Sequence, residues 1–250
     1  MLLEGTHLLQ EVLRQGNAPE EIIATEAWLQ GHSALAARCS QARWRIVTDE
    51  VLRAALTTVT PDGVACLSPL KALPPVPAEL DFVLVLDRIQ DPGNLGTLLR
   101  TALAADVSAV WMGAGVDPLG TKVLRASAGA LLQLPHQRFG PSEAMAISQL
   151  QQELKQLVAL GVQVVATLVP DATKADPPVP YWDLDWTLPT ALVLGTEGAG
   201  LHPDLQACCT HAVTLPHSAR VESLNVASAA VPLLLERRRA TMTATSQQFG

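Results

Sequence analysis

The chain has 250 residues, of which 48% are hydrophobic and 16% are charged, a composition that excludes a disordered chain and allows one or two domains with a buried core. Its formal net charge of −7 argues against broad electrostatic binding of nucleic acid, so an RNA site would need a local basic patch. Without an apolar run near the ~20 residues that span a bilayer, a visible secretory signal or a Cys-x-x-Cys pair, we expect no membrane segment, no metal and a cytoplasmic protein.

Residues 1–67 alternate helical and strand-like patterns. The predicted elements are a helix over 6–16, strands over 22–24 and 45–47, a helix that begins after Thr48, and a strand over 64–67. Thr6 and Thr48 are residue types that cap helices, and two acids follow Thr48 where the helix dipole favours them. We therefore expect a small α/β domain over 1–67.

Prolines crowd residues 68–78, which indicates a linker between two patterned regions. The second region, 79–240, is expected to form a separate domain, followed by a polar, frayed tail over 241–250. Five apolar runs in this region predict strands, and two long amphipathic stretches predict helices. The strands are expected at 82–87, 109–113, 162–168, 190–195 and 211–216, and the helices at 143–160 and 223–239. Alternation of this kind predicts a largely parallel sheet covered on both faces.

The stretch LDRIQDPGNLGTLLRTA, residues 86–102, places a charge in an apolar helix. It leaves a strand, breaks at 91–93 and restarts as a helix whose leucines form one stripe. Arg100 lies off that stripe, one turn after Gly96, so we expect its side chain in a groove that Gly96 leaves open, near a loop that Asn94 helps to cap. The alternative is a solvated arginine along the helix flank.

Two further loops also follow predicted strands, where ligands of parallel α/β sheets bind. LVLGTEGAGL, residues 192–201, spaces three glycines around Glu197, which permits close backbone approach to a ligand or simply a tight turn. LPHSARVESLNVASAAVPLLLE, residues 215–236, contains Ser223 and Asn225, both helix-capping residue types. If Ser223 caps the helix, Asn225 is left for another task.

Together, the three loops resemble the three motifs of the SpoU/TrmH family of RNA ribose 2′-O-methyltransferases, within the SPOUT superfamily. The matching segments are Asp91 to Ala102, Leu194 to Gly200, and Pro216 with Glu222 to Val226. Residues 122–135 resemble the family's stretch between motifs, and residues 1–67 resemble the RNA substrate-binding domain often fused in front. The resemblance covers the whole region after the linker.

This resemblance implies a C-terminal α/β domain with a trefoil knot, S-adenosylmethionine as cofactor, and a homodimer whose active sites draw on both chains. The cofactor-binding residues that it implies are Thr167, Leu194, Gly195, Glu197, Gly198, Leu215, Pro216, Leu224 and Asn225. The catalytic residues that it implies are Arg100, Asn94, Glu197, Ser223 and Asn225. No metal is implied.

Arg100 matches the family's catalytic arginine, which is proposed there as the base. Because arginine hardly deprotonates in proteins, holding a phosphate and stabilising the forming alkoxide is the easier physical role. Glu197 and Asn225 are expected to orient Arg100 or the ribose, and Asn94 to brace the loop. Pro232 should kink the last helix or interrupt its hydrogen-bond ladder, which puts the family's dimer packing in doubt.

The expected function is S-adenosylmethionine-dependent methylation of a ribose 2′-hydroxyl in RNA. The extra N-terminal domain favours ribosomal RNA, and transfer RNA is the alternative. A second alternative is a non-catalytic RNA-binding relative. A third, a nucleotide-dependent dehydrogenase, requires G-x-G-x-x-G after the first strand, and residues 93–96 do not supply it.

Overall fold

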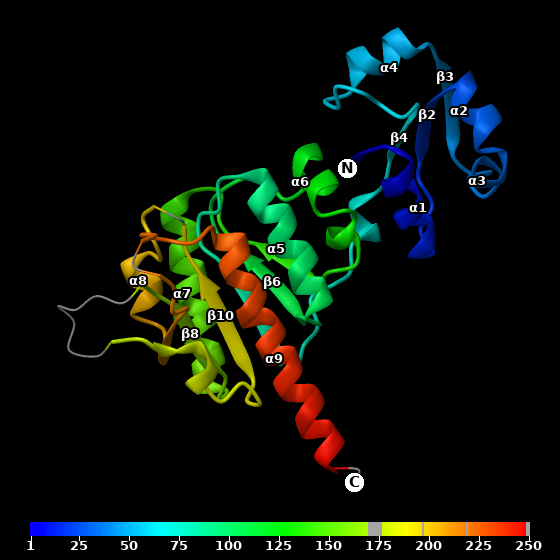
Figure 1. Ribbon diagram of the computed structural model, residues 1–250. Helices are drawn as coiled ribbons and strands as arrows, with labels where there is room; N and C mark the ends of the chain where they lie inside the picture. Colours follow the sequence, from blue (N-terminus) through cyan, green and yellow to red (C-terminus); the bar gives the residue numbers. More distant parts are fainter. Residues whose placement is uncertain (170–176, 197, 219, 249–250) are drawn as a thin grey trace.

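The chain folds around two sheets, one on either side of residues 68–78. The computed structural model describes residues 1–169, 177–196, 198–218 and 220–248, with side chains up to residue 243. The first sheet has the strand order β1-β4-β2-β3, and the second has the order β7-β6-β5-β10-β8-β11-β9 (Figure 1). Every strand pair in the second sheet is parallel, which confirms the predicted α/β class.

The first sheet carries four short helices. Its elements are β1 (Leu2–Glu4), α1 (Thr6–Arg14), β2 (Glu21–Thr25), α2 (Glu26–Gly31), α3 (Ser33–Ala37), β3 (Arg43–Val47), α4 (Asp49–Ala55) and β4 (Val64–Leu67). Thr48 caps α4 as predicted, because its hydroxyl accepts a hydrogen bond from Val51 N at 3.4 Å. The predicted cap at Thr6 is wrong: Gly5 takes the cap position, and the Thr6 hydroxyl accepts a 2.7 Å bond from Trp28 Nε1.

The second sheet contains the five predicted strands and two shorter ones. Its strands are β5 (Phe82–Leu86), β6 (Ala109–Met112), β7 (His136–Arg138), β8 (Gln163–Thr167), β9 (Val179–Pro180), β10 (Thr190–Leu194) and β11 (His211–Thr214). The helices are η1 (Leu70–Ala72), α5 (Pro92–Ala104), α6 (Thr121–Ala126), η2 (Ala130–Leu132), α7 (Glu143–Ala159), η3 (Tyr181–Asp183), α8 (Pro203–Gln206) and α9 (Val226–Gln248).

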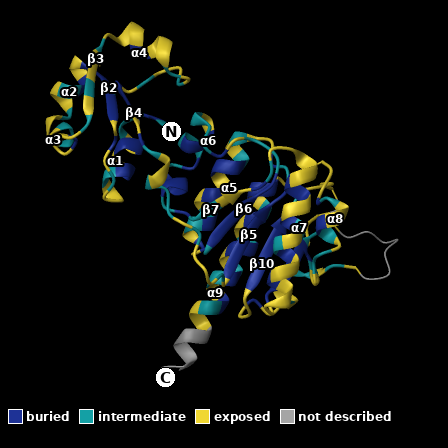
Figure 2. Cartoon of the chain, turned by 180° about the vertical axis from the view of Figure 1, so that it is seen from behind, coloured by how far each residue is buried: buried dark blue, intermediate teal, exposed yellow. Residues whose placement is uncertain are grey.

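Helices cover both faces of the parallel sheet, which explains why its strands read as continuous apolar runs. Along β5, Phe82, Leu84 and Leu86 pack in a core with α5 and α9. Val83 and Val85 point the other way, into a second core with α7 and α8. Helices α5 and α9 lie in front of the sheet in Figure 1, and α7 lies in front of it in the reverse view of Figure 2.

The last helix differs from its prediction at its start. Helix α9 begins at Val226, three residues later than expected, because residues 215–218 and 220–225 are not helical. It then continues through Pro232 to Gln248, so Pro232 does not end the helix, and a kink at this residue stays a prediction. A proline removes only its own N–H from the backbone ladder, and packing on α5 holds the rest. The trefoil knot stays a prediction.

The two sheets are joined by buried contacts as well as by residues 68–78. The Glu4 carboxylate, at the end of β1, is 1% exposed and pairs with Arg125 of α6. It also accepts hydrogen bonds from the backbone N–H groups of Thr57 and Thr58, at 2.9 and 3.1 Å. One apolar core runs across this interface, from Leu3 of β1 to the helices on the second sheet. Because these contacts join the two sheets, a division into two domains at residues 68–78 stays a prediction.

No helix among the described residues is both long and apolar enough to cross a bilayer.

Candidate functional site

A cavity of about 550 Å³ opens at the carboxyl ends of three neighbouring strands, β8, β10 and β11. Parallel strands end at the same edge of a sheet, so the loops that follow them meet there. The predicted site residues that line this cavity are Thr167, Leu194, Gly195, Gly198, Leu215, Ser223 and Leu224. Pro216 and Asn225 lie outside the lining, and Glu197 lies outside the described residues. The second and third motif loops thus form one site.

The second motif loop folds back on itself, and two of its glycines make this possible. Thr196 and Gly200 exchange backbone hydrogen bonds of 3.1 and 3.0 Å. A Cβ atom on Gly195 would lie 2.3 Å from the carbonyl carbon and oxygen of Gly200, closer than atoms can approach. Gly200 has φ 66°, a conformation that other residues rarely adopt. Nothing lies within 4 Å of the Cβ position of Gly198, so this glycine borders open space.

The polar groups of the cavity suit a ligand with both apolar and hydrogen-bonding parts. The Thr167 hydroxyl is buried and has no hydrogen-bond partner in the described chain, as expected if a ligand supplies one. Leu194, Leu215 and Leu224 provide apolar walls. The imidazole of His217 donates from Nδ1 to its own loop, at Leu215 O, 2.7 Å away. These residues fit S-adenosylmethionine, which has an apolar-faced base, a ribose and a charged amino-acid end.

The first motif meets the third through two asparagines. The amide Nδ2 of Asn225 donates to Oδ1 of Asn94 at 2.9 Å. The side-chain oxygen of Asn225 also accepts from the backbone N–H groups of Ala227 and Ser228, at 3.0 and 3.1 Å. Asn225 is therefore the cap of α9, and of the two cap-type residues Ser223 is the one left for another task. Ser223 and Asn225 are both suited to cap a helix by residue type. Asn225 is the cap because α9 begins at Val226, directly after it.

The cap of α5 comes from the first motif itself. The carboxylate of Asp91 accepts from Asn94 N at 2.8 Å, so Asp91 caps this helix. The carboxylate reaches a free N–H of the first turn, where it also suits the helix dipole. This arrangement leaves the Asn94 side chain directed at Asn225.

Arg100 is exposed on α5 and does not line the cavity. Its side chain makes no hydrogen bond or ion pair with any residue that the structure describes. The expected groove beside Gly96 is filled: a Cβ on Gly96 would lie 2.3 Å from Ala126 Cβ and 2.7 Å from Ala126 C. Gly96 thus makes room for the end of α6, and the prediction that it shelters Arg100 is wrong. The guanidinium faces solvent, as in the alternative considered for it.

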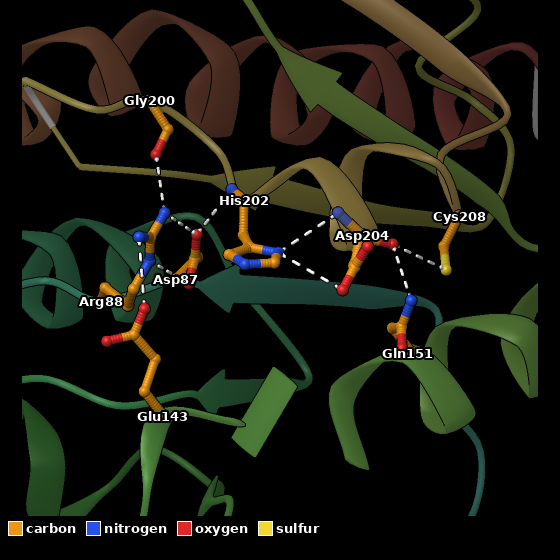
Figure 3. Close-up of polar contacts among 8 residues, drawn as sticks. All are labelled: Asp87, Arg88, Glu143, Gln151, Gly200, His202, Asp204 and Cys208. Carbon is orange, nitrogen blue, oxygen red and sulfur yellow. Dashed lines mark hydrogen bonds and ion pairs between the residues drawn. The ribbon is translucent and has the colours of Figure 1, made fainter. Parts of the chain in front are cut away.

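A buried ion pair supports the second motif loop, and the sequence analysis missed it (Figure 3). Asp87 follows β5 directly and is 1% exposed, and its two oxygens accept from Nε and Nη2 of Arg88, each at 3.0 Å. Asp87 Oδ2 also accepts from His202 N at 2.9 Å. The hydrogen bonds to Asp87 raise the pKa of the Arg88 guanidinium above its usual value. An acid directly after a fully buried strand was the available signal, because a buried carboxylate requires a partner.

Among the described residues, no three His, Cys, Asp or Glu side chains gather closely enough to hold a metal ion.

Comparison with known proteins identifies the family. Residues 81–234 match the model of the SpoU rRNA Methylase family. An uncharacterized tRNA/rRNA methyltransferase of Synechocystis is 40% identical over 98% of this chain and 86% of its own length. RlmP of Bacillus subtilis, a 23S rRNA guanosine 2′-O-methyltransferase, is 31% identical over 95% of this chain and 88% of its own. The AdoMet-bound rRNA methyltransferase of Sinorhizobium meliloti superposes with a TM-score of 0.75 at 26% identity, covering 95% of this chain and 86% of that one. This chain belongs to the SpoU rRNA methylase family.

Proposed function

We propose that this protein transfers a methyl group from S-adenosylmethionine to a ribose 2′-hydroxyl of ribosomal RNA. The observation that carries this proposal is the meeting of the second and third motif loops around one cavity with an unpaired Thr167 hydroxyl. Family membership supports the reaction class. The activity in the name of the Bacillus subtilis relative supports ribosomal RNA as the substrate.

In this proposal the cavity holds the cofactor, whose sulfonium supplies an activated methyl group. Leu194, Leu215 and Leu224 enclose its apolar parts, and Thr167 supplies a hydroxyl at the end of β8. Gly195 lets the loop close on Gly200, and Gly198 leaves open space beside the loop backbone for the ligand. Pro216 and Asn225 act from outside the lining, by fixing the path of the third motif loop.

Arg100 binds RNA in this proposal, because its exposed guanidinium forms no hydrogen bond or ion pair with any described residue. A guanidinium can hold a phosphate through two parallel hydrogen bonds and stabilise the alkoxide that forms as the 2′-hydroxyl loses its proton. The Asn94–Asn225 bond keeps the start of α5 next to the third motif loop. Ser223 and Glu197 complete the proposed set of catalytic residues.

We also propose a homodimer built on α9. Val231, Leu235 and Met242 are 37%, 43% and 59% exposed, and their spacing places them along one flank of the helix. Arg100 does not line the cavity, which fits an active site completed by a second copy. Light scattering of the wild type and of Leu235→Glu tests this proposal, since the charge should shift a dimer towards monomer mass.

We also propose a trefoil knot in the C-terminal domain and a cytoplasmic location for the protein. All four cysteines are free, which suits a reducing compartment.

Residues 1–67 are proposed to bind the RNA substrate. This role is supported by arginines on exposed parts of β3 and α4, namely Arg43, Arg45 and Arg53.

Labelled S-adenosylmethionine tests the proposed function directly. The purified chain is incubated with 23S rRNA, 16S rRNA and transfer RNA from cells that lack this protein, and the product is mapped by its resistance to alkaline cleavage. Methyl transfer to a ribosomal ribose is the expected result. Transfer to transfer RNA alone would favour the alternative substrate. Cofactor binding without transfer to any RNA would favour a non-catalytic relative.

A further inference from the structure

We propose that Asp87 and Arg88 are positioning residues for the cofactor, because they hold the second motif loop in its ligand-binding shape. This inference rests on the proposed function for the identity of the ligand. Neither residue lines the cavity. Both come from the chain segment that follows β5, whereas the loop that they hold follows β10, the strand beside β5.

The Arg88 guanidinium contacts three separate segments. It forms the paired bonds to Asp87, its Nη1 donates to Glu143 Oε1 at 3.4 Å, and its Nη2 donates to Gly200 O at 3.5 Å (Figure 3). Glu143 begins α7, and Gly200 closes the second motif loop by its backbone bonds with Thr196. Arg88 itself has φ 54°, an uncommon conformation for a residue with a side chain. The neighbouring carboxylate holds this conformation through its two oxygens.

One side chain from outside the second motif loop supports its closing turn. Arg88 Nη2 donates to Gly200 O, a backbone group at the end of that loop. Directly after the loop, His202 N donates to Asp87 Oδ2, so the same carboxylate fixes the exit of the loop. A loop with three glycines loses much conformational entropy when it is ordered. Holding it before the ligand arrives should therefore increase cofactor affinity.

The chemistry of arginine matters for this role. Arginine presents a planar fork that can bond both oxygens of Asp87 while one nitrogen also reaches Gly200 O. Lysine keeps the positive charge beside the buried Asp87 but cannot make these bonds together. Arg88→Lys should thus preserve the fold better than Arg88→Ala, which leaves a buried carboxylate without its cation.

The test measures cofactor binding separately from catalysis, by calorimetry with S-adenosylmethionine and S-adenosylhomocysteine. Arg88→Lys is expected to raise both dissociation constants about tenfold, the usual effect of losing a hydrogen bond from a charged group. The stoichiometry should stay unchanged, because a purely structural role would lower the fraction of competent protein instead. The single-turnover rate at saturating cofactor and RNA should stay within about twofold of wild type.

Two matched variants locate the effect. Glu143→Gln removes the ion pair between Arg88 and the Glu143 carboxylate, whose side chain is 57% exposed. This variant should leave cofactor affinity unchanged. Arg138→Ala removes another arginine that bonds a loop carbonyl, Gly115 O at 3.0 Å, away from the cavity, and should do the same. Wild-type affinity in Arg88→Lys, or an equal loss in Arg138→Ala, would overturn the proposal.

Amide hydrogen exchange of the free protein gives a readout that needs no cofactor. The N–H groups of Thr196 and Gly200 are bonded within the loop, and they should exchange faster in Arg88→Lys than in the wild type. Unchanged exchange at both amides would overturn the positioning role. If the wild type binds neither cofactor form, the proposed function is wrong, and the exchange result alone still decides whether Arg88 holds the loop.

Discussion

Replacing Arg100 with alanine should slow methyl transfer by about two to three orders of magnitude while sparing cofactor binding. Arg100 lies on α5 and outside the cavity, whereas the cavity is lined by the loops that follow β8, β10 and β11. Loss of one preorganised charge-assisted contact to a transition state costs roughly 3–4 kcal/mol, or about 10²–10³ in rate. Stability should change by no more than ~0.5 kcal/mol, since the exposed guanidinium makes no bond within the described chain.

Single-turnover transfer with folded Arg100→Ala is the assay, together with a calorimetric titration of S-adenosylmethionine. Arg100→Lys should not restore activity, because a point charge lacks the planar fork that grips a phosphate while touching a second group. Lys155→Ala is the matched control: it removes the same charge from the exposed side of α7, on the opposite face of the sheet. Wild-type transfer by Arg100→Ala, or loss of cofactor binding together with activity, would refute the reasoning.

Three further predictions follow from the described geometry. Gly195→Ala should lose cofactor binding, because its Cβ would lie 2.3 Å from Gly200, whereas Gly198→Ala should fold and keep the loop shape; calorimetry of both variants checks this contrast. Asn225→Ala should destabilise the protein by about 1 kcal/mol through loss of the α9 cap, measured by urea denaturation. Burial would raise the pKa of Glu4, but hydrogen bonds from Thr58 and Thr57 and the charge of Arg125 lower it on balance. The stability that this carboxylate contributes is present above its unfolded pKa and is lost as pH falls through its lowered folded pKa. Glu4→Gln should therefore be less stable than wild type at pH 7, with a smaller difference in acid; an equal difference at both pH values would contradict this.

The strands of the parallel sheet were predictable because each is covered on both faces. The run at 82–86 is apolar without alternation, and β5 has one side on α5 and α9 and the other on α7. The motif loops were predictable for a related reason, since each follows such a strand. Two of them do meet at one cavity. Strand β1 was missed because three residues give too short a pattern to recognise.

What the sequence could not show were contacts between distant segments. Gly96 was interpreted from its neighbours on the same helix, but its partner is Ala126, thirty positions away on α6. Asp87 reads locally as the end of a strand, and no local pattern indicates its bond with His202, 115 residues further along. The choice between Ser223 and Asn225 as cap depended on where the preceding loop turns into α9. In each case the local pattern permitted several structures, and tertiary packing selected one.

The buried pair of Glu4 and Arg125 has a consequence for protein engineering. A chimera that exchanges residues 1–67 for another module would leave the Arg125 side chain, 30% exposed in this structure, without its carboxylate. It would also uncover the apolar surface of α6 that now packs against β1. A transplanted module therefore needs an acid at the position of Glu4 and an apolar residue beside it, as Leu3 is here. To direct this chain to a new RNA, the contacts between β1 and α6 would have to be rebuilt before the RNA-facing surface is changed.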